Sequence, residues 1–271
     1  SVISGTAEAG ATVTLTDSNA SPIGQVTADG NGNWSFIPAS PLPNGTVVVA
    51  IASDATGNVS SQAATTVDAL APVAPVVNPS NGSVISGTAE AGAKVIITDG
   101  SGNPVGETTA DSGGNWSVTP ATPLLNGTVI NVVAQDPAGN TGPQGSATVD
   151  GLAPGAPTVN LSNGNSLSGT AEANSKVIIT DSIGNPIGQT TADSAGNWSY
   201  TPGTPIADGT QVQVIAQDAA GNNSQQASVT IDATPPAAPV INLSNGSVIS
   251  GTAEAGATVT LTDSNASPIG Q

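Results

Sequence analysis

The sequence predicts an all-β protein, a tandem array of small seven-stranded Greek-key sandwiches. Ser-Gly-Thr-Ala-Glu recurs at 82-residue steps, starting at Ser4, Ser86, Ser168 and Ser250. The three tryptophans keep the same step, at Trp34, Trp116 and Trp198. Residues 1–25 and 247–271 are identical. A fixed period of this length indicates that one small folding unit is repeated along the chain.

The period divides the chain into four parts. We expect an incomplete repeat at 1–68 without its first strand, complete repeats at 69–150 and 151–232, and the first strands of a fourth repeat at 233–271. We expect the chain to be a window from a longer array. The alternative is that the two incomplete ends pair between molecules, because the missing pieces have nearly the same sequence.

Within the unit 69–150, short β-branched segments alternate with Gly, Asn, Asp and Pro clusters, which is the pattern of strands and turns. The predicted strands are 74–78, 83–90, 94–99, 104–110, 115–119, 128–136 and 143–150. The longer, Pro-containing stretch 120–127 predicts a crossover between two sheets.

Alternating side chains indicate strands with one buried face. In the segment that starts at Gln211, Val212, Val214 and Ala216 are predicted to face inward. The alternation around each tryptophan also predicts that Trp34, Trp116 and Trp198 lie in the cores. Seven short strands around a single tryptophan favour a sandwich of the immunoglobulin type.

Three motifs in a fixed order carry a resemblance to a known family. They are the 13 residues from Gly5 to Asp17, the segment Thr27-Ala-Asp-Gly-Asn-Gly-Asn-Trp-Ser, and the turn from Asp54 to Asn58. The chain resembles the bacterial immunoglobulin-like repeats of biofilm-associated proteins and giant non-fimbrial adhesins. The resemblance implies a shaft at the bacterial cell surface, often exported by type I secretion, that acts in adhesion and biofilm formation. It also implies calcium at joints between domains.

Composition narrows the classes of function. The chain has 2 basic and 19 acidic residues, a formal charge of −17, and no His, Cys or Met. This charge argues against binding nucleic acid or an anionic membrane surface, and no apolar run is long enough for a membrane span. An enzyme is not expected, because a Ser nucleophile would lack a His base and every candidate group is repeated in each unit.

Seventeen of the nineteen carboxylates recur at five positions of the repeat. If successive strands run up and down, these positions fall at the ends of each unit, where they would meet a neighbour. Oxygen-rich groups of this kind suit Ca²⁺. The predicted ligands are Asp17, Asp68, Asp111 and Asp136 at the first joint, Asp99, Asp150, Asp193 and Asp218 at the second, and Asp181 and Asp232 at a partial third.

Two alternatives remain open at this level. Asp-x-x-Gly-Asn is also a common turn sequence, in which the carboxylate bonds only to its own backbone. The alternative to a shaft function is a carbohydrate-binding or self-associating adhesive module of the biofilm matrix. Its expected partners are like chains on neighbouring cells or matrix polysaccharide.

Overall fold

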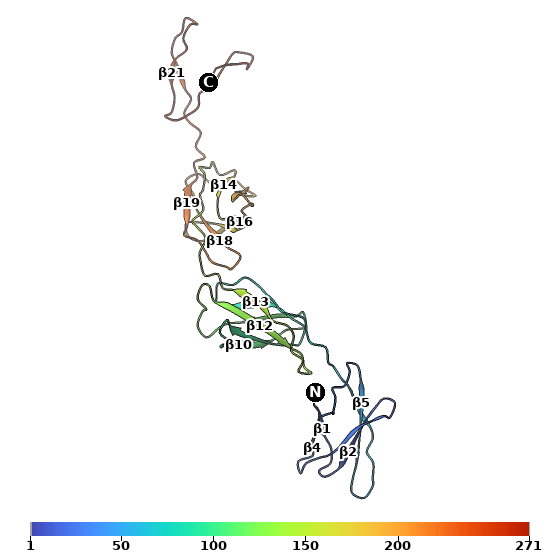
Figure 1. Cartoon of the computed structure of the whole chain (residues 1–271). Coiled ribbons are helices and arrows are strands. Elements are labelled where there is room, and N and C mark those ends of the chain that lie inside the picture. The colour runs from blue at the N-terminus through green and yellow to red at the C-terminus, as the bar shows by residue number, and fades with distance from the viewer. Residues whose placement is uncertain (1, 271) are drawn as a thin grey trace. The chain divides into compact units, whose positions relative to one another are not determined.

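The computed structural model of the chain describes residues 2–270 (Figure 1). Every helix or strand assigned in these residues is a β-strand, which confirms the predicted all-β class. The chain divides into two compact units, Ser1–Gly151 and Leu152–Gln271, which are described separately.

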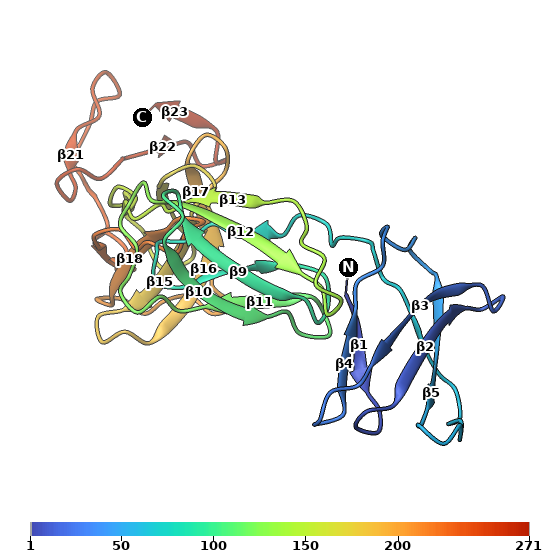
Figure 2. The ribbon, with the colours of Figure 1, turned by 60° about the horizontal axis from the view of Figure 1, so that its bottom comes forward.

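The repeat 69–150 is a complete sandwich of two antiparallel sheets (Figure 2). Its strands are β7 (Val76–Val77), β8 (Ile85–Thr88), β9 (Lys94–Asp99), β10 (Pro104–Thr109), β11 (Asn115–Val118), β12 (Val129–Gln135) and β13 (Gly145–Thr148). One sheet has the order β10-β9-β12-β13 and the other β11-β8-β7. All seven predicted strands are therefore present, and the chain changes sheet between β11 and β12, where the crossover was predicted.

The repeat 151–232 has the same arrangement. Its strands are β14 (Leu167–Thr170), β15 (Lys176–Asp181), β16 (Pro186–Thr191), β17 (Asn197–Tyr200), β18 (Gln211–Gln217) and β19 (Ala227–Thr230). They form the sheets β16-β15-β18-β19 and β14-β17. The segment before β14 still follows the path of a first strand, because Thr158 donates its backbone N–H to Thr170 and Asn160 donates to Ser168.

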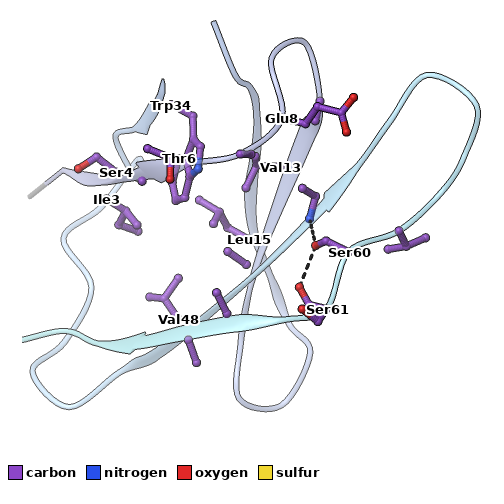
Figure 3. Close-up of a pocket in the computed structure, with 18 of the residues that line it drawn as sticks. Ile3, Ser4, Thr6, Glu8, Val13, Leu15, Trp34, Val48, Ser60 and Ser61 are labelled. Atoms are coloured by element: carbon purple, nitrogen blue, oxygen red, sulfur yellow. Dashed lines mark hydrogen bonds between the residues drawn. The ribbon is translucent and has the colours of Figure 1, made fainter. Parts of the chain in front are cut away.

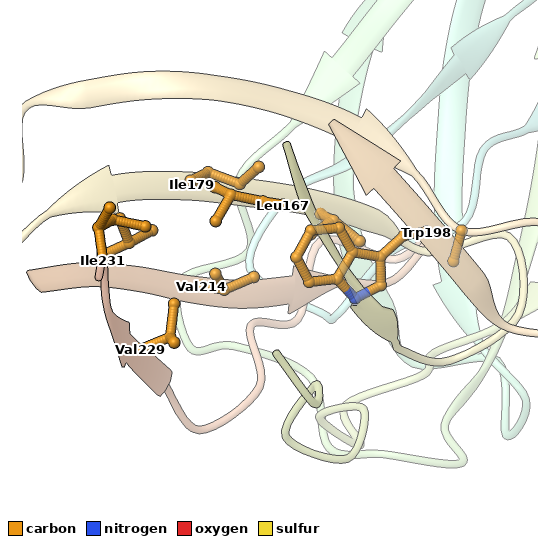
Figure 4. Packing of buried hydrophobic residues seen from close by; sticks show 9 residues of the cluster. Leu167, Ile179, Trp198, Val214, Val229 and Ile231 are labelled. Atoms are coloured by element: carbon orange, nitrogen blue, oxygen red, sulfur yellow. The ribbon is translucent and has the colours of Figure 1, made fainter. Parts of the chain in front are cut away.

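Each complete repeat has its own core. In the repeat 151–232, Leu167, Val177, Ile179, Val212 and Val214 are fully buried around Trp198 (Figure 4). Trp198 is 3% exposed and Trp116, its counterpart in the repeat 69–150, is 4% exposed. A strongly buried aromatic ring of this size removes a large apolar area from water and contributes much of the stability of so small a core.

A glycine opposite the tryptophan makes this packing fit. A Cβ added at Gly169 would lie 1.9 Å from the carbonyl oxygen of Thr158 and 3.0 Å from Cζ2 of Trp198. The position is therefore squeezed between the first strand and the indole ring. This explains the Gly of the repeated Ser-Gly-Thr-Ala-Glu motif.

The repeat 1–68 has six strands: β1 (Ile3–Thr6), β2 (Thr12–Asp17), β3 (Pro22–Thr27), β4 (Asn33–Phe36), β5 (Val47–Ser53) and β6 (Ala63–Thr66). They form the sheets β3-β2-β5-β6 and β1-β4. Its core cluster contains three buried residues, Val13, Leu15 and Val48, and Trp34 is only partly buried.

Residues 233–270 form two short hairpin-like pairs and no buried core. β20 (Val240–Ile241) pairs with β21 (Gly251–Thr252), and β22 (Leu261–Thr262) pairs with β23 (Pro268–Gly270). Nearly all of their side chains are exposed. Counterparts of the fifth, sixth and seventh strands do not occur in this part of the described chain.

The repeat ends and the predicted calcium sites

Backbone hydrogen bonds and strand pairing show at which end of a repeat each acidic turn lies. In the repeat 69–150, Ala89 donates its N–H to Gly114, which ties the turn of Glu90 to the turn of Asp111. The end of β12 lies at the start of β9, because Gln135 pairs with Lys94, so the turn of Asp136 lies at this end too. The turns of Asp111 and Asp136 are two that the up-and-down prediction assigns to one end of this repeat.

The remaining acidic turn and the chain exit lie at the opposite end. The side-chain amide of Asn131 donates to the carbonyl oxygen of Asp99 at 3.5 Å. The backbone N–H of Asp150 donates to Ser80 in the first turn of the repeat. Each complete repeat thus presents acidic side chains at both ends.

Most of the turn aspartates bond to their own turn. Oδ1 of Asp111 accepts the N–H groups of Gly113 and Asn115, both at 2.8 Å. Gly114 has φ +81° and donates its N–H to the Asp111 carbonyl oxygen at 2.9 Å. The same pair of Oδ1 bonds, to residues two and four positions ahead, occurs at Asp17, Asp29, Asp54, Asp99, Asp181, Asp193 and Asp263.

In several turns the second carboxylate oxygen is also engaged. Nδ2 of the closing asparagine donates to Oδ2 of Asp54, Asp99, Asp136, Asp181 and Asp218 at 2.7–2.8 Å. Hydrogen bonds to the charged form of a carboxyl lower its pKa. The side chain of Asn58, followed by its backbone N–H, lowers the pKa of Asp54 to about 2. The Asn140 side chain likewise lowers the pKa of Asp136, which is buried.

The donor chemistry of these ends suits calcium, but three carboxylates do not gather at any one place in residues 2–270. At the first joint, Asp17, Asp111 and Asp136 each begin a separate turn, and Asp68 lies in the linker. The predicted ligands of the second joint, Asp99, Asp150, Asp193 and Asp218, belong to two units. Asp181 and Asp232 both belong to the repeat 151–232. Calcium at the joints therefore stays a prediction.

Two of the predicted residues of the first joint share one partner. Nδ2 of Asn140 donates to the backbone carbonyl oxygen of Asp68 at 3.0 Å and to Oδ2 of Asp136 at 2.7 Å. Asn140 thus connects the turn after β12 with the linker that enters its own repeat.

A second set of hydrogen bonds connects each linker to the repeat that precedes it. Oδ1 of Asn44 accepts the N–H of Ala69 at 2.9 Å, and Oδ1 of Asn126 accepts the N–H of Gly151 at 2.9 Å. At the third equivalent position, Oδ1 of Asp208 accepts the N–H of Ala233 at 2.7 Å. These contacts were not predicted from the sequence. An Asn-Gly pair is sufficiently explained as a turn, and its partner lies 25 residues away.

The third linker carries an extra bond. Oδ2 of Asp208 accepts the hydroxyl of Thr234 at 3.0 Å. The backbone N–H of Ala233, and then the Thr234 hydroxyl, lower the pKa of Asp208. We call Asn44, Asn126 and Asp208 the linker caps.

A family model described as "Bacterial Ig domain" matches residues 1–69, 71–151 and 153–233. The chain belongs to the bacterial Ig domain family. Its matched segments cover most of the chain and follow the repeats of the structure. A comparison with curated proteins found no match.

Solved structures similar to this bacterial Ig domain chain match it at low identity and low TM-score. "Biofilm associated protein - BSP domain" is 14% identical over 83% of this chain, with a TM-score of 0.30, and the chain spans about 60% of that structure's length. Chicken CNTN1 FN1-FN3 domains are 14% identical over 85% of this chain and 94% of theirs, with a TM-score of 0.35. Fibronectin(III)-like modules of Clostridium thermocellum CbhA are 18% identical over 59% of this chain and 91% of theirs, with a TM-score of 0.32.

A helix long and apolar enough to span a membrane does not occur among residues 2–270.

Proposed function

We propose that this chain is a shaft segment of a bacterial cell-surface adhesin and that it acts in cell adhesion and biofilm formation. The observation that carries the proposal is the tandem array itself: three matches to one family, with linkers held by side-chain hydrogen bonds. An array of this kind would act as a spacer, which holds the binding part of an adhesin away from its anchor on the cell. The proposal assigns the chain no catalytic role and an extracellular location.

We also propose that calcium stiffens the joints. At the first joint the carboxylates of Asp68 and Asp136, with the side-chain oxygen of Asn140, would supply hard oxygen ligands. The shared contacts of Asn140 support this choice, because they hold the linker and the turn of Asp136 at the same place. Binding would require Asn140 to turn its amide oxygen toward the ion.

Carbohydrate binding by stacking on tryptophan is a weaker candidate. Trp116 and Trp198 are buried, so their ring faces are not available to a sugar. Matrix polysaccharide and like chains on neighbouring cells remain proposed partners of a shaft, recognised through other surfaces.

Calcium is tested on the full chain by differential scanning calorimetry in CaCl₂, in MgCl₂ and in EGTA. We expect the melting temperature to rise in CaCl₂ and to stay near its EGTA value in MgCl₂, because a ligand that binds only the folded state stabilises it. Asp68→Asn with Asp136→Asn should weaken the response. Equal melting temperatures in CaCl₂ and EGTA would contradict the calcium proposal. They would not contradict the shaft proposal, which does not require calcium.

The shaft role is tested on the cell surface. A chain with a displayed tag at one end and an anchor at the other should expose the tag to antibody according to the number of repeats between them. Loss of one complete repeat, 82 residues, should reduce antibody access and adhesion together. An adhesion that depends on the repeats but not on their number would contradict a spacing role.

A further inference from the structure

The two end segments of each complete repeat lie next to each other. In the repeat 69–150 they are residues 72–80, which contain β7, and residues 142–150, which contain β13. We call them the entry segment and the exit segment. β7 pairs with β8 and β13 pairs with β12, so the two segments belong to different sheets and contact each other at one side of the sandwich.

The entry and exit segments run in the same direction. The carbonyl oxygen of Pro72 lies so close to Gly142 that an added Cβ would overlap it, and the carbonyl oxygen three residues further on lies in the same way against Gly145. At the other end of the pair, the backbone N–H of Asp150 donates to the carbonyl oxygen of Ser80 at 3.0 Å. Because successive contacts advance along both segments, the segments are parallel.

The chain enters and leaves the repeat at opposite ends. Asn140 holds the incoming linker at the end that carries the turn of Asp136. The chain leaves through Asp150, beside the turn that contains Ser80 at the other end. Tension along the array therefore pulls the entry segment toward one end of the repeat and the exit segment toward the other. Parallel neighbours that are pulled in this way are loaded in shear.

The hydrogen bonds that hold the two segments share such a load. Asn78 donates its N–H to the carbonyl oxygen of Ser86 at 2.9 Å beside the β7–β8 pairs, and the exit segment pairs with β12 from Gly145 to Thr148. Ladder bonds in an antiparallel pair are perpendicular to the strands. A pull along the strands therefore strains all of these bonds at once, whereas a pull across the strands would break them one at a time.

Apolar packing opposes sliding of the segments. Pro72 and Pro75 are buried, Val77 packs against the core, and Val149 is 1% exposed. Proline has no backbone N–H, so Pro72 and Pro75 hold the entry segment by packing and not by donating ladder bonds. Sliding would move these side chains into water, which is unfavourable in proportion to the apolar area exposed.

The repeat 151–232 is built in the same way. Thr158, in the segment before β14, donates its backbone N–H to Thr170 at 2.7 Å, and Asp232 donates its N–H to Ser162 at 3.1 Å. Pro157, in the same segment, is buried. The arrangement of the two end segments is therefore a property of the complete repeat.

We propose that each complete repeat is a tension-bearing clamp, which its entry and exit segments hold closed when the chain is stretched. The linker caps Asn44 and Asn126 each contribute one hydrogen bond to a linker, so tension should release them before it opens a repeat. The inference rests on the proposed shaft function, because a shaft is the part of an adhesin that carries tension. It requires no calcium.

Single-molecule force spectroscopy on the full chain in EGTA tests the clamp. When the chain is pulled through handles at its two ends, we expect two high-force steps, one for each complete repeat. Each step should release one repeat of 82 residues, which spans up to ~290 Å when it is extended.

The full chain can also be pulled across the strands, because it has no Cys and handles can be attached at chosen positions. Handles at Ser83→Cys and Thr148→Cys, both exposed positions, would separate β13 from β12 pair by pair, starting at Thr148. We expect the repeat to open at a force at least about twofold lower than in the end-to-end pull at the same loading rate. Equal forces in the two directions would overturn the proposal. That result would leave the spacing role intact, which antibody access measures separately.

A wedge between the two segments tests their contact. Gly145→Val places a side chain where the carbonyl oxygen of Pro75 lies, and we expect one of the two end-to-end steps to occur at about 1.5-fold lower force, because overpacking is destabilising. The step of the repeat 151–232 is the internal reference. Ser146→Val is the matched control, because Ser146 is exposed on the same strand, and both steps should then keep the parent force.

The wedge has two outcomes that would overturn the proposal. One is an unchanged force for both steps in Gly145→Val, and the other is an equal decrease in Ser146→Val. If Gly145→Val prevents the repeat from folding, the comparison of the two pulling directions still decides, because it leaves Gly145 in place.

Discussion

Asn140 donates its side-chain N–H to the backbone carbonyl oxygen of Asp68 at 3.0 Å, across the boundary between the first and second repeats. The same amide nitrogen lies 2.7 Å from Oδ2 of Asp136. The residue that closes an acidic turn therefore also holds a linker. This dual contact makes the repeat end a structural part of the joint.

Asn140→Ala should loosen the first joint. The variant loses a bond to the linker, which we expect to destabilise the joint by about 1 kcal/mol, the net value of a typical hydrogen bond. Limited proteolysis should then cut residues 69–73 faster than in the parent chain. Asn103→Ala is the control, because Asn103 makes the same bond to Asp99 at the other end of the repeat. Faster cutting in both variants alike would argue against a specific role for Asn140.

The linker caps should protect single backbone amides. Asn44→Ala removes the acceptor of the Ala69 N–H, and Asn126→Ala removes the acceptor of the Gly151 N–H. We expect roughly two- to tenfold faster hydrogen exchange at the affected amide, which corresponds to a bond of about 0.5–1.5 kcal/mol. NMR measures this amide by amide. Unchanged exchange at Ala69 in Asn44→Ala would show that the cap does not order the linker.

Stability should fall in acid because the turn carboxylates have lowered pKa values. Asp54 has a pKa of about 2 in the fold, below its ordinary value of 3.8, and the pKa of Asp99 is lowered mainly by the Asn103 side chain. A lowered pKa stabilises the fold above the unfolded value, and this contribution is lost as pH falls through the folded one.

Thermal unfolding followed by circular dichroism from pH 6 to pH 2 measures this loss. The steepest loss is expected between about pH 4 and pH 2. Protonation also relieves repulsion within a chain of charge −17, which acts in the opposite direction. Asp54→Asn should flatten the acid slope of the first repeat. A slope unchanged by Asp54→Asn would contradict the assignment of Asp54 to this effect.

The tryptophans should contribute unequally to stability. Trp116→Ala and Trp198→Ala each leave a cavity in a closed core, and such substitutions destabilise by about 3–5 kcal/mol. Trp34→Ala should cost less, because Trp34 is only partly buried and lines an open pocket of the repeat 1–68 (Figure 3). Urea unfolding followed by circular dichroism compares the three variants. A larger loss for Trp34→Ala than for Trp198→Ala would contradict the link between burial of the indole ring and stability.

The repeat was readable from the sequence because its strands alternate and its turns carry Gly at fixed positions. The turn of Asp111 shows this well, since Gly114 needs a positive φ that few other residues adopt. The burial of Trp116 and Trp198 follows from the same alternation. Local patterns of this kind depend only on neighbouring residues.

The contacts of the linkers were not readable in the same way. Asn44 and Ala69 are far apart in sequence, and an Asn-Gly pair has a sufficient local explanation as a turn. Whether Asp17, Asp68, Asp111 and Asp136 converge depends on how two repeats meet, which periodicity does not encode. The degree of exposure of Trp34 depends on whether a strand covers it, and its own motif is the same in every repeat.

The central claim is that the repeats form a stiff shaft. Because the chain has no Cys, dyes can be placed at Asn31→Cys in the first repeat and Ala195→Cys in the third, both exposed turn positions. Single-molecule energy transfer between them measures the distribution of distances. The account predicts a narrow distribution that narrows further in CaCl₂ and broadens in Asn140→Ala. A broad distribution of freely jointed domains, unaffected by calcium or by Asn140→Ala, would contradict it.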